Sequence, residues 1–150
     1  MANTYTSLHY HVVFSTKNRE NHIRAEAKDR IWAFIGGIAR ENKMKALCVG
    51  GTENHIHILL MAPPAIALSK MVQLLKGGSS KWIHDTFPGM KRFAWQDGYG
   101  AFTVSKSQIP EVIRYIENQY DHHRVKSFQE EYLAFLKTHG IEYDDRYVCG

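Results

Sequence analysis

Apolar and polar positions alternate with a period of two near the start of the chain. Over residues 8–15 the even-numbered positions are apolar or aromatic, and His9 and His11 fall on the opposite face. This alternation predicts a half-buried β-strand. Gly50-Gly51 predicts a turn after the first of three further strands. Those strands are predicted at residues 46–49, 55–61 and 101–105.

Apolar residues recur at helical spacing in four other segments. The second of these passes through Gly77-Gly78, and the third begins near Pro110, a residue suited to the first turn of a helix. The four predicted helices are residues 25–42, 68–83, 110–124 and 128–136.

The order of these elements, β-α-β-β-α-β followed by helices, is that of the ferredoxin-like α+β fold, which is also described as RRM-like. We expect one domain over residues 1–150, with two helices against one face of the sheet and further helices at the C-terminal end. The other face is expected to be open. Its outward positions include His9, His11, His55 and His57.

Composition narrows the class of protein. The chain has 150 residues, and its 44% hydrophobic and 23% charged residues exclude a disordered or collagen-like chain. A net charge of +4 allows a polyanionic partner without requiring one. Cys48 and Cys149 lack the spacing of a metal or disulfide framework, which fits a reducing cytoplasm. We expect neither a signal peptide nor a membrane span, and therefore a soluble protein.

Nine histidines are the unusual feature of the composition, and two of them form His55-Ile56-His57. Two residues at i and i+2 of a strand share a face, roughly 6.5–7 Å apart along the chain. Two imidazoles at that spacing can share a divalent metal ion. The alternative is that they are ordinary polar side chains on the sheet surface.

Tyr115 and Gln119 form a second candidate group. They are four residues apart in the third predicted helix and are therefore neighbours on one face, with His122 on the same stripe. One interpretation is an interfacial tyrosine that packs its ring and exposes its hydroxyl. The other makes Tyr115 a nucleophile and the amide oxygen of Gln119 a ligand of the same metal. The spacing does not decide between them.

The ordered set of these motifs resembles the single-tyrosine HUH transposases of the IS-two-hundred-like bacterial insertion sequences. The resemblance runs from about residue 8 to the last helix. It is carried by His55-Ile56-His57, by residues 115–119 and by His122-His123, with further matches at Thr16-Lys17, residues 75–80 and residues 95–102.

The resemblance implies an enzyme that cleaves and rejoins single-stranded DNA through a 5′-phosphotyrosine. It makes Tyr115 the nucleophile and makes His55, His57 and Gln119 the ligands of Mg²⁺ or Mn²⁺. It implies a substrate with subterminal hairpins, and a homodimer whose active sites are shared between subunits. The expected location is the cytoplasm of a bacterium or archaeon.

The resemblance leaves the remaining histidines and the basic residues open. His9 and His11 either support the metal site through hydrogen bonds or supply a ligand themselves, and His122 either orients Gln119 or contacts DNA. The candidate phosphate contacts are Lys17, Arg19, Lys76, Lys81, Lys91 and Arg92.

Three alternatives compete with the transposase hypothesis. Residues 98–104 are similar to the signature of RNA-recognition modules, but Asp97 and Ala101 stand where a basic residue and a stacking aromatic residue belong. A metal-dependent phosphoesterase would use the same histidines with water as its nucleophile. A domesticated relative would act on repeated chromosomal palindromes instead of a mobile element.

Overall fold

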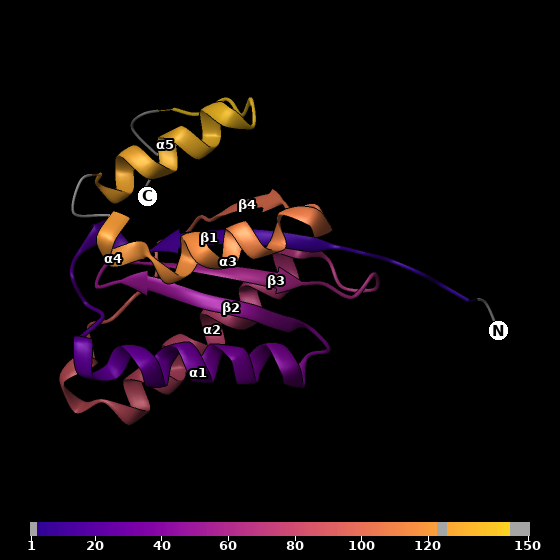
Figure 1. Ribbon diagram of the computed structural model, residues 1–150. Helices are drawn as coiled ribbons and strands as arrows, with labels where there is room; N and C mark the ends of the chain where they lie inside the picture. Colours follow the sequence, from indigo (N-terminus) through magenta and orange to yellow (C-terminus); the bar gives the residue numbers. More distant parts are fainter. Residues whose placement is uncertain (1–2, 123–125, 145–150) are drawn as a thin grey trace.

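The computed structural model describes residues 3–122 and 126–144 (Figure 1). The side chains of Tyr120 and His122 lie outside this description, as does His123. The strands are β1 His9–Ser15, β2 Lys45–Thr52, β3 His55–Met61 and β4 Gly100–Thr103. The helices are α1 Ala25–Glu41, α2 Leu68–Thr86, α3 Ile109–Glu117, α4 Gln119–His122 and α5 Phe128–Thr138.

The four strands form one antiparallel sheet in the order β2-β3-β1-β4. This order, with helices in the β1–β2 and β3–β4 connections, confirms the predicted ferredoxin-like α+β fold. In the central pair, Val13 of β1 lies opposite His57 of β3, and His11 lies opposite Leu59. Because directly opposite residues share a face, the histidines of both strands lie on the same side of the sheet.

Helices α1 and α2 cover the other side of the sheet and enclose the main apolar core (Figure 1). The even-numbered residues of β1 and β3 supply the centre of this core, and all of them except the partly buried Tyr10 have no exposed surface. Residues such as Ile31 and Ile35 of α1 and Leu75 of α2 pack against them. The periodicity of the sequence therefore assigned this face correctly.

The histidine face is covered, and the expectation that it is open is wrong. Helices α3 and α5 lie over it (Figure 1). A second, smaller core forms there, in which Phe128, Tyr132 and Leu136 of α5 pack on Val13 and Phe102 of the sheet. The physical reason is that α5 carries an apolar stripe that needs a surface to bury it.

The predicted turn at Gly50-Gly51 is also wrong. Strand β2 continues through both glycines to Thr52, and the chain reverses before His55. Gly51 has φ of +150°, which L side chains rarely adopt, and Gly50 lies against Ile116 of α3. Both glycines therefore serve the strand and its packing rather than a turn.

Other boundaries shift by smaller amounts. Strand β4 ends at Thr103, two residues before the predicted end. The helix expected over residues 110–124 is interrupted at Asn118, which separates α3 from α4. Within the described residues, no helix has the length and apolar character that crossing a bilayer requires.

Replacing Gly50 with alanine tests the close approach of α3 to β2. A Cβ atom at Gly50 would lie 2.6 Å from the backbone oxygen of Ile116. We expect Gly50→Ala to lower the free energy of unfolding by about 1–3 kcal/mol, measured by chemical denaturation. The matched control is Gly77→Ala in α2, where a Cβ meets nothing within 4 Å. That variant should be neutral or slightly stabilising, and equal losses in both would contradict the packing described.

Candidate active site

His55 and His57 occupy alternate positions of β3, so both side chains lie on the face covered by α3 and α5. Neither has any exposed surface. Their rings meet edge to face, with centroids 5.1 Å apart. Ile56 between them points into the main core and fixes the strand. The sequence therefore placed this pair correctly but missed its burial.

His55 turns one ring nitrogen to the β2–β3 connection and the other to the interior. Its Nδ1 lies 2.8 Å from Oδ1 of Asn54, and its Nε2 lies 2.9 Å from Oε1 of Gln119 and 3.9 Å from Oε1 of Glu131. With the ring hydrogen on Nδ1, the lone pair of Nε2 would point toward the oxygens of Gln119 and Glu131. Such an arrangement of lone-pair atoms is one that a cation stabilises.

Glu131 of α5 lies over the histidine pair and contacts both His57 and Tyr115. Its Oε1 atom lies 3.0 Å from Nε2 of His57, and its Oε2 atom accepts a hydrogen bond from the hydroxyl of Tyr115. Only 1% of this residue is exposed. A carboxylate in such surroundings is retained only where charged or hydrogen-bonding groups compensate its lost hydration.

Tyr115 lies on α3 and is half-buried, with its ring edge to face with that of His57 at 5.7 Å. Burial raises the pKa of the Tyr115 phenol well above its usual value, and the nearby Glu131 carboxylate raises it further. The phenol is therefore a neutral hydrogen-bond donor in this conformation. The carbonyl of Tyr115 accepts a hydrogen bond from the amide of Gln119, which turns Oε1 of Gln119 toward His55.

The structure thus brings all four sequence-predicted residues, Tyr115, His55, His57 and Gln119, to one place. His55, His57 and Glu131 can hold a metal ion, because one ligand atom from each lies within 4.8 Å of the others. Two imidazole nitrogens and a carboxylate oxygen are a common donor set for divalent metals. The residues present therefore fit a bound divalent ion, whose identity the donor set does not fix.

Comparison with known proteins agrees with this arrangement of histidines, tyrosine and acidic residue. The sequence profile of the family described as "Transposase IS200 like" matches residues 4–119, well over half of the chain. The chain belongs to this family.

Two curated relatives are transposases of insertion sequences. The ISDra2 transposase TnpA of Deinococcus radiodurans is 29% identical over 76% of this chain and 85% of its own length. The IS200 transposase of Salmonella typhimurium is 28% identical over 81% of this chain and 82% of its own length.

Two solved structures share the fold. A crystal structure from Deinococcus radiodurans that is assigned to the transposases has a TM-score of 0.63 and 26% identity, covering 79% of this chain and 96% of that one. A REP-associated tyrosine transposase bound to a REP hairpin has a TM-score of 0.57 and 14% identity, covering 79% and 70%. At that identity the second likeness concerns the fold alone.

Glu131 is the residue of this IS200-like transposase that the sequence analysis missed. It lies in the last helix, outside the motifs that carry the resemblance, and beyond residues 4–119 that the family profile matches. A signal was nevertheless present, because Phe128, Tyr132 and Phe135 define the apolar stripe of the last helix and Glu131 falls within that stripe. An acidic residue at a buried helical position needs a partner, and here the partners are the two histidines and Tyr115.

His11 and His9 occupy different surroundings. The Nε2 atom of His11 lies 2.7 Å from Nδ1 of His57, which makes His11 a hydrogen-bonding neighbour of a candidate ligand. Burial lowers the pKa of His11 to about 3, with a further contribution from His57, so its ring is neutral. His9 is buried, and within the described residues its Nδ1 has no hydrogen-bond partner. The side chain of His122 lies outside the described residues.

The predicted phosphate contacts fall into two groups. Lys17, Arg19, Lys91 and Arg92 are exposed, in two segments joined by the hydrogen bond from the Lys17 amide to the Ala94 carbonyl. Lys81 and Lys76 have partners within the fold. Lys81 pairs with the exposed Asp85, and the ammonium of Lys76 donates to the carbonyls of residues 96, 97 and 98.

Removing the Glu131 carboxylate should weaken metal binding. With Mn²⁺ as the probe, the protein should melt at a higher temperature, because an ion that binds only the folded state stabilises it. We expect Glu131→Ala to abolish most of this shift, since a ligand is lost. Glu130→Ala is the control, because Glu130 is exposed and caps α5 without reaching the site. Equal Mn²⁺-dependent shifts in both variants would contradict a role for Glu131 in holding metal.

Proposed function

We propose that this transposase cleaves and rejoins single-stranded DNA at the ends of an insertion sequence, with Tyr115 as the nucleophile. The observation that carries the proposal is the convergence of the Tyr115 hydroxyl with His55, His57 and Glu131 in one buried cluster. A tyrosine that only packs its ring has no need of a site suited to metal beside its hydroxyl. Family membership supports the same assignment.

In the proposed step the phenol oxygen of Tyr115 forms a bond to the scissile phosphorus. The bond from phosphorus to the 3′-oxygen of the preceding nucleotide breaks, and that oxygen leaves as a hydroxyl after taking up the proton that the phenol gives up. The product is a 5′-phosphotyrosine and a free 3′-end. Because the phosphodiester bond is exchanged rather than hydrolysed, rejoining to another 3′-hydroxyl needs no nucleotide cofactor.

His55, His57 and Gln119 are the proposed ligands of a divalent ion, Mg²⁺ or Mn²⁺, and Glu131 adds a carboxylate to this set. A bound ion would offset negative charge on the scissile phosphate and on the phenol oxygen. The hydrogen bond at Nδ1 of His55 and that at Nδ1 of His57 keep both rings oriented with Nε2 toward the centre.

The described conformation is closed to DNA. The candidate ligands are at most 1% exposed, and the hydroxyl of Tyr115 is held by Glu131. A phosphodiester needs the place beside Tyr115 and the histidines that the Glu131 carboxylate occupies. Catalysis in this proposal therefore requires Glu131 to withdraw when the substrate enters.

The exposed basic residues offer a path for the DNA strand. Thr16 bonds to the carbonyl of Asn54, next to His55, so the chain reaches Lys17 and Arg19 at the same end of the sheet as the histidine pair. Arg92 and Lys91 adjoin them through the contact between Lys17 and Ala94. We infer that these four residues neutralise phosphates of a strand that leads to the site.

The partners follow from the same proposal. The substrate is single-stranded DNA with subterminal hairpins, and the active form is a homodimer. In the proposed dimer the active sites are shared between subunits, and the contact between Tyr115 and His57 within one chain belongs to the described conformation. Action on repeated palindromes remains the alternative substrate, and a phosphoesterase that uses water remains the alternative chemistry. An RNA-recognition module is disfavoured by family membership.

Replacing Tyr115 with phenylalanine separates tyrosine attack from attack by water. Incubation with a hairpin-ended single-stranded DNA and Mg²⁺ or Mn²⁺ should give a protein–DNA adduct that survives denaturation. The adduct should disappear in Tyr115→Phe, because the attacking oxygen is absent, while Tyr143→Phe at an exposed tyrosine should retain it. Strand cleavage that persists in Tyr115→Phe would instead favour the phosphoesterase.

Removal of single basic charges tests the proposed DNA path. Each lost phosphate contact should reduce the slope of log affinity against log salt by about 0.7 for a single strand. We expect this reduction for Lys17→Ala and for Arg92→Ala, measured by fluorescence anisotropy with a labelled oligonucleotide. Lys45→Ala, at the other end of β2 from Thr52, removes the same charge and should leave the slope unchanged. An equal reduction in all three would show that only net charge matters.

A further inference from the structure

A small cavity lies beside the closed site. Its volume is about 290 Å³, and it is enclosed by residues of β1, β4, the connection from β4 to α3, α3 itself and α5. Among the lining residues, Val112 stands one helical turn before Tyr115 on α3, and His11 contacts His57. A molecule in this cavity therefore lies about one helical turn from Tyr115 and in contact with His11, the neighbour of the candidate ligand His57.

Aromatic rings form much of the cavity wall. Phe102 of β4 and Phe135 of α5 stack with centroids 5.2 Å apart, and His139 lies over Phe102 at 4.6 Å. Phe135 also meets Tyr115 edge to face at 5.8 Å. Phe135 and His139 are only partly covered. Partly exposed aromatic faces at the mouth of a small cavity suit a flat, unsaturated ring.

His11 supplies a polar group at the inner wall. It is 4% exposed, and its Nε2 is engaged by Nδ1 of His57. Its other ring nitrogen, Nδ1, is not among the buried atoms that lack a hydrogen-bond partner. A ligand in the cavity that reaches Nδ1 can form a hydrogen bond with it. Gln108 and Ser105 add further hydrogen-bonding groups at the rim.

We propose that this cavity binds one unpaired nucleobase of the DNA strand, from a nucleotide adjacent to the bond that Tyr115 attacks. The inference rests on the proposed function, because it is the strand held at Tyr115 that brings the base to Val112. The volume is close to the lower limit of small-molecule pockets, roughly 300 Å³, which suits a base rather than a whole nucleotide. Stacking on the aromatic wall and one hydrogen bond to His11 position the strand.

The candidate metal site sets the hydrogen-bonding character of His11. When Nε2 of His57 faces a cation, the hydrogen of that ring resides on Nδ1 and is donated to Nε2 of His11. The neutral His11 ring then carries its own hydrogen on Nδ1, and it presents a donor to the cavity. A base that turns a carbonyl oxygen or ring nitrogen toward His11 pairs with it. Base binding and metal binding therefore favour the same tautomers.

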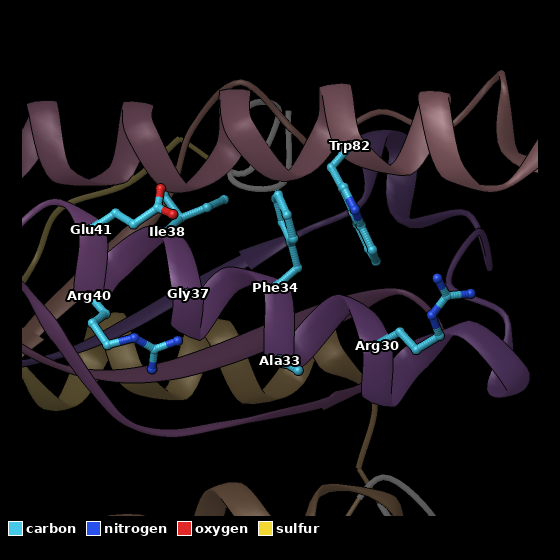
Figure 2. Close-up of a pocket in the computed structure, with 8 residues that line it drawn as sticks. All are labelled: Arg30, Ala33, Phe34, Gly37, Ile38, Arg40, Glu41 and Trp82. Carbon is cyan, nitrogen blue, oxygen red and sulfur yellow. The ribbon is translucent and has the colours of Figure 1, made fainter.

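A larger groove on the opposite side of the sheet also has stacked aromatic rings, but its described lining residues include no histidine. It lies between α1 and α2, has a volume of about 470 Å³, and is lined by Phe34, Trp82 and Arg30 (Figure 2). There the rings of Phe34 and Trp82 stack on each other at 4.3 Å. Helices α1 and α2 lie on the far side of the sheet from α3, the helix that carries Tyr115 (Figure 1). It serves as the internal control for unspecific stacking.

The experiment uses the full chain with isotopically labelled histidine and tryptophan, observed by NMR in the presence of Mg²⁺. The probes are the four deoxynucleosides, which lack a phosphate and so do not report on binding to the metal. We expect saturable shifts of the His11 ring signals, and nitrogen shifts that place its hydrogen on Nδ1. In Val112→Phe, which fills the cavity, the affinity should fall by about tenfold or more. In Ala33→Phe, which fills the groove between α1 and α2, it should be unchanged.

Gln108→Trp keeps the test decisive if Val112→Phe does not fold, because Gln108 is exposed and a large ring there covers the mouth of the cavity. Absence of a His11 shift, an unchanged shift in the filled cavity, or shifts confined to Trp82 would overturn the proposal. The Tyr115 adduct is measured in the same preparations. An adduct without base binding refutes only the base site, whereas base binding without an adduct refutes the proposed strand transfer.

Discussion

The structure depends on keeping one carboxylate buried between the sheet and its last helix. Glu131 is stable there because it faces the imidazole of His57 and the hydroxyl of Tyr115. His57 also pairs with His11, and the backbone carbonyl of Tyr115 accepts from Gln119, so the carboxylate belongs to a buried polar network. Loss of one member leaves its partner buried without that hydrogen bond, which costs more than the hydrogen bond itself contributes. The contacts of Glu131 with His57 and Tyr115 thus hold α5 in place and at the same time close the candidate site.

Much of the fold follows from local pattern. β1 and β3 were predicted almost to the residue, because strict alternation on a half-buried strand leaves only one register that buries the even-numbered positions. The turn at Gly50-Gly51 failed for a tertiary reason. Glycine is typical of turns, but here its missing side chain makes room for Ile116, and nothing local in the sequence distinguishes these two uses.

In the candidate site, too, local motifs could be predicted from the sequence and tertiary contacts could not. The pair His55 and His57 could be found from spacing, and Tyr115 and Gln119 from the resemblance, because each motif is local in the chain. Their convergence depends on long-range packing of α3 and α5 over the sheet. Predicting Glu131 as a site residue requires knowing which surface the apolar stripe of α5 packs against. That surface is the histidine face of the sheet, which the sequence analysis expected to be open. Burial of the histidines was missed for the same reason.

The sheet separates two apolar cores of unequal size, and only the smaller one lies beside the candidate site. The large core under α1 and α2 holds the scaffold together, whereas the small core of Phe128, Tyr132 and Leu136 holds α5 over the candidate site. The two cores are built from different residues, and a segment held by few buried apolar contacts opens at a lower free energy than the whole fold. Substitutions in α5 can therefore tune how often the tyrosine is uncovered, in evolution or by design, while the scaffold that aligns the histidines stays intact.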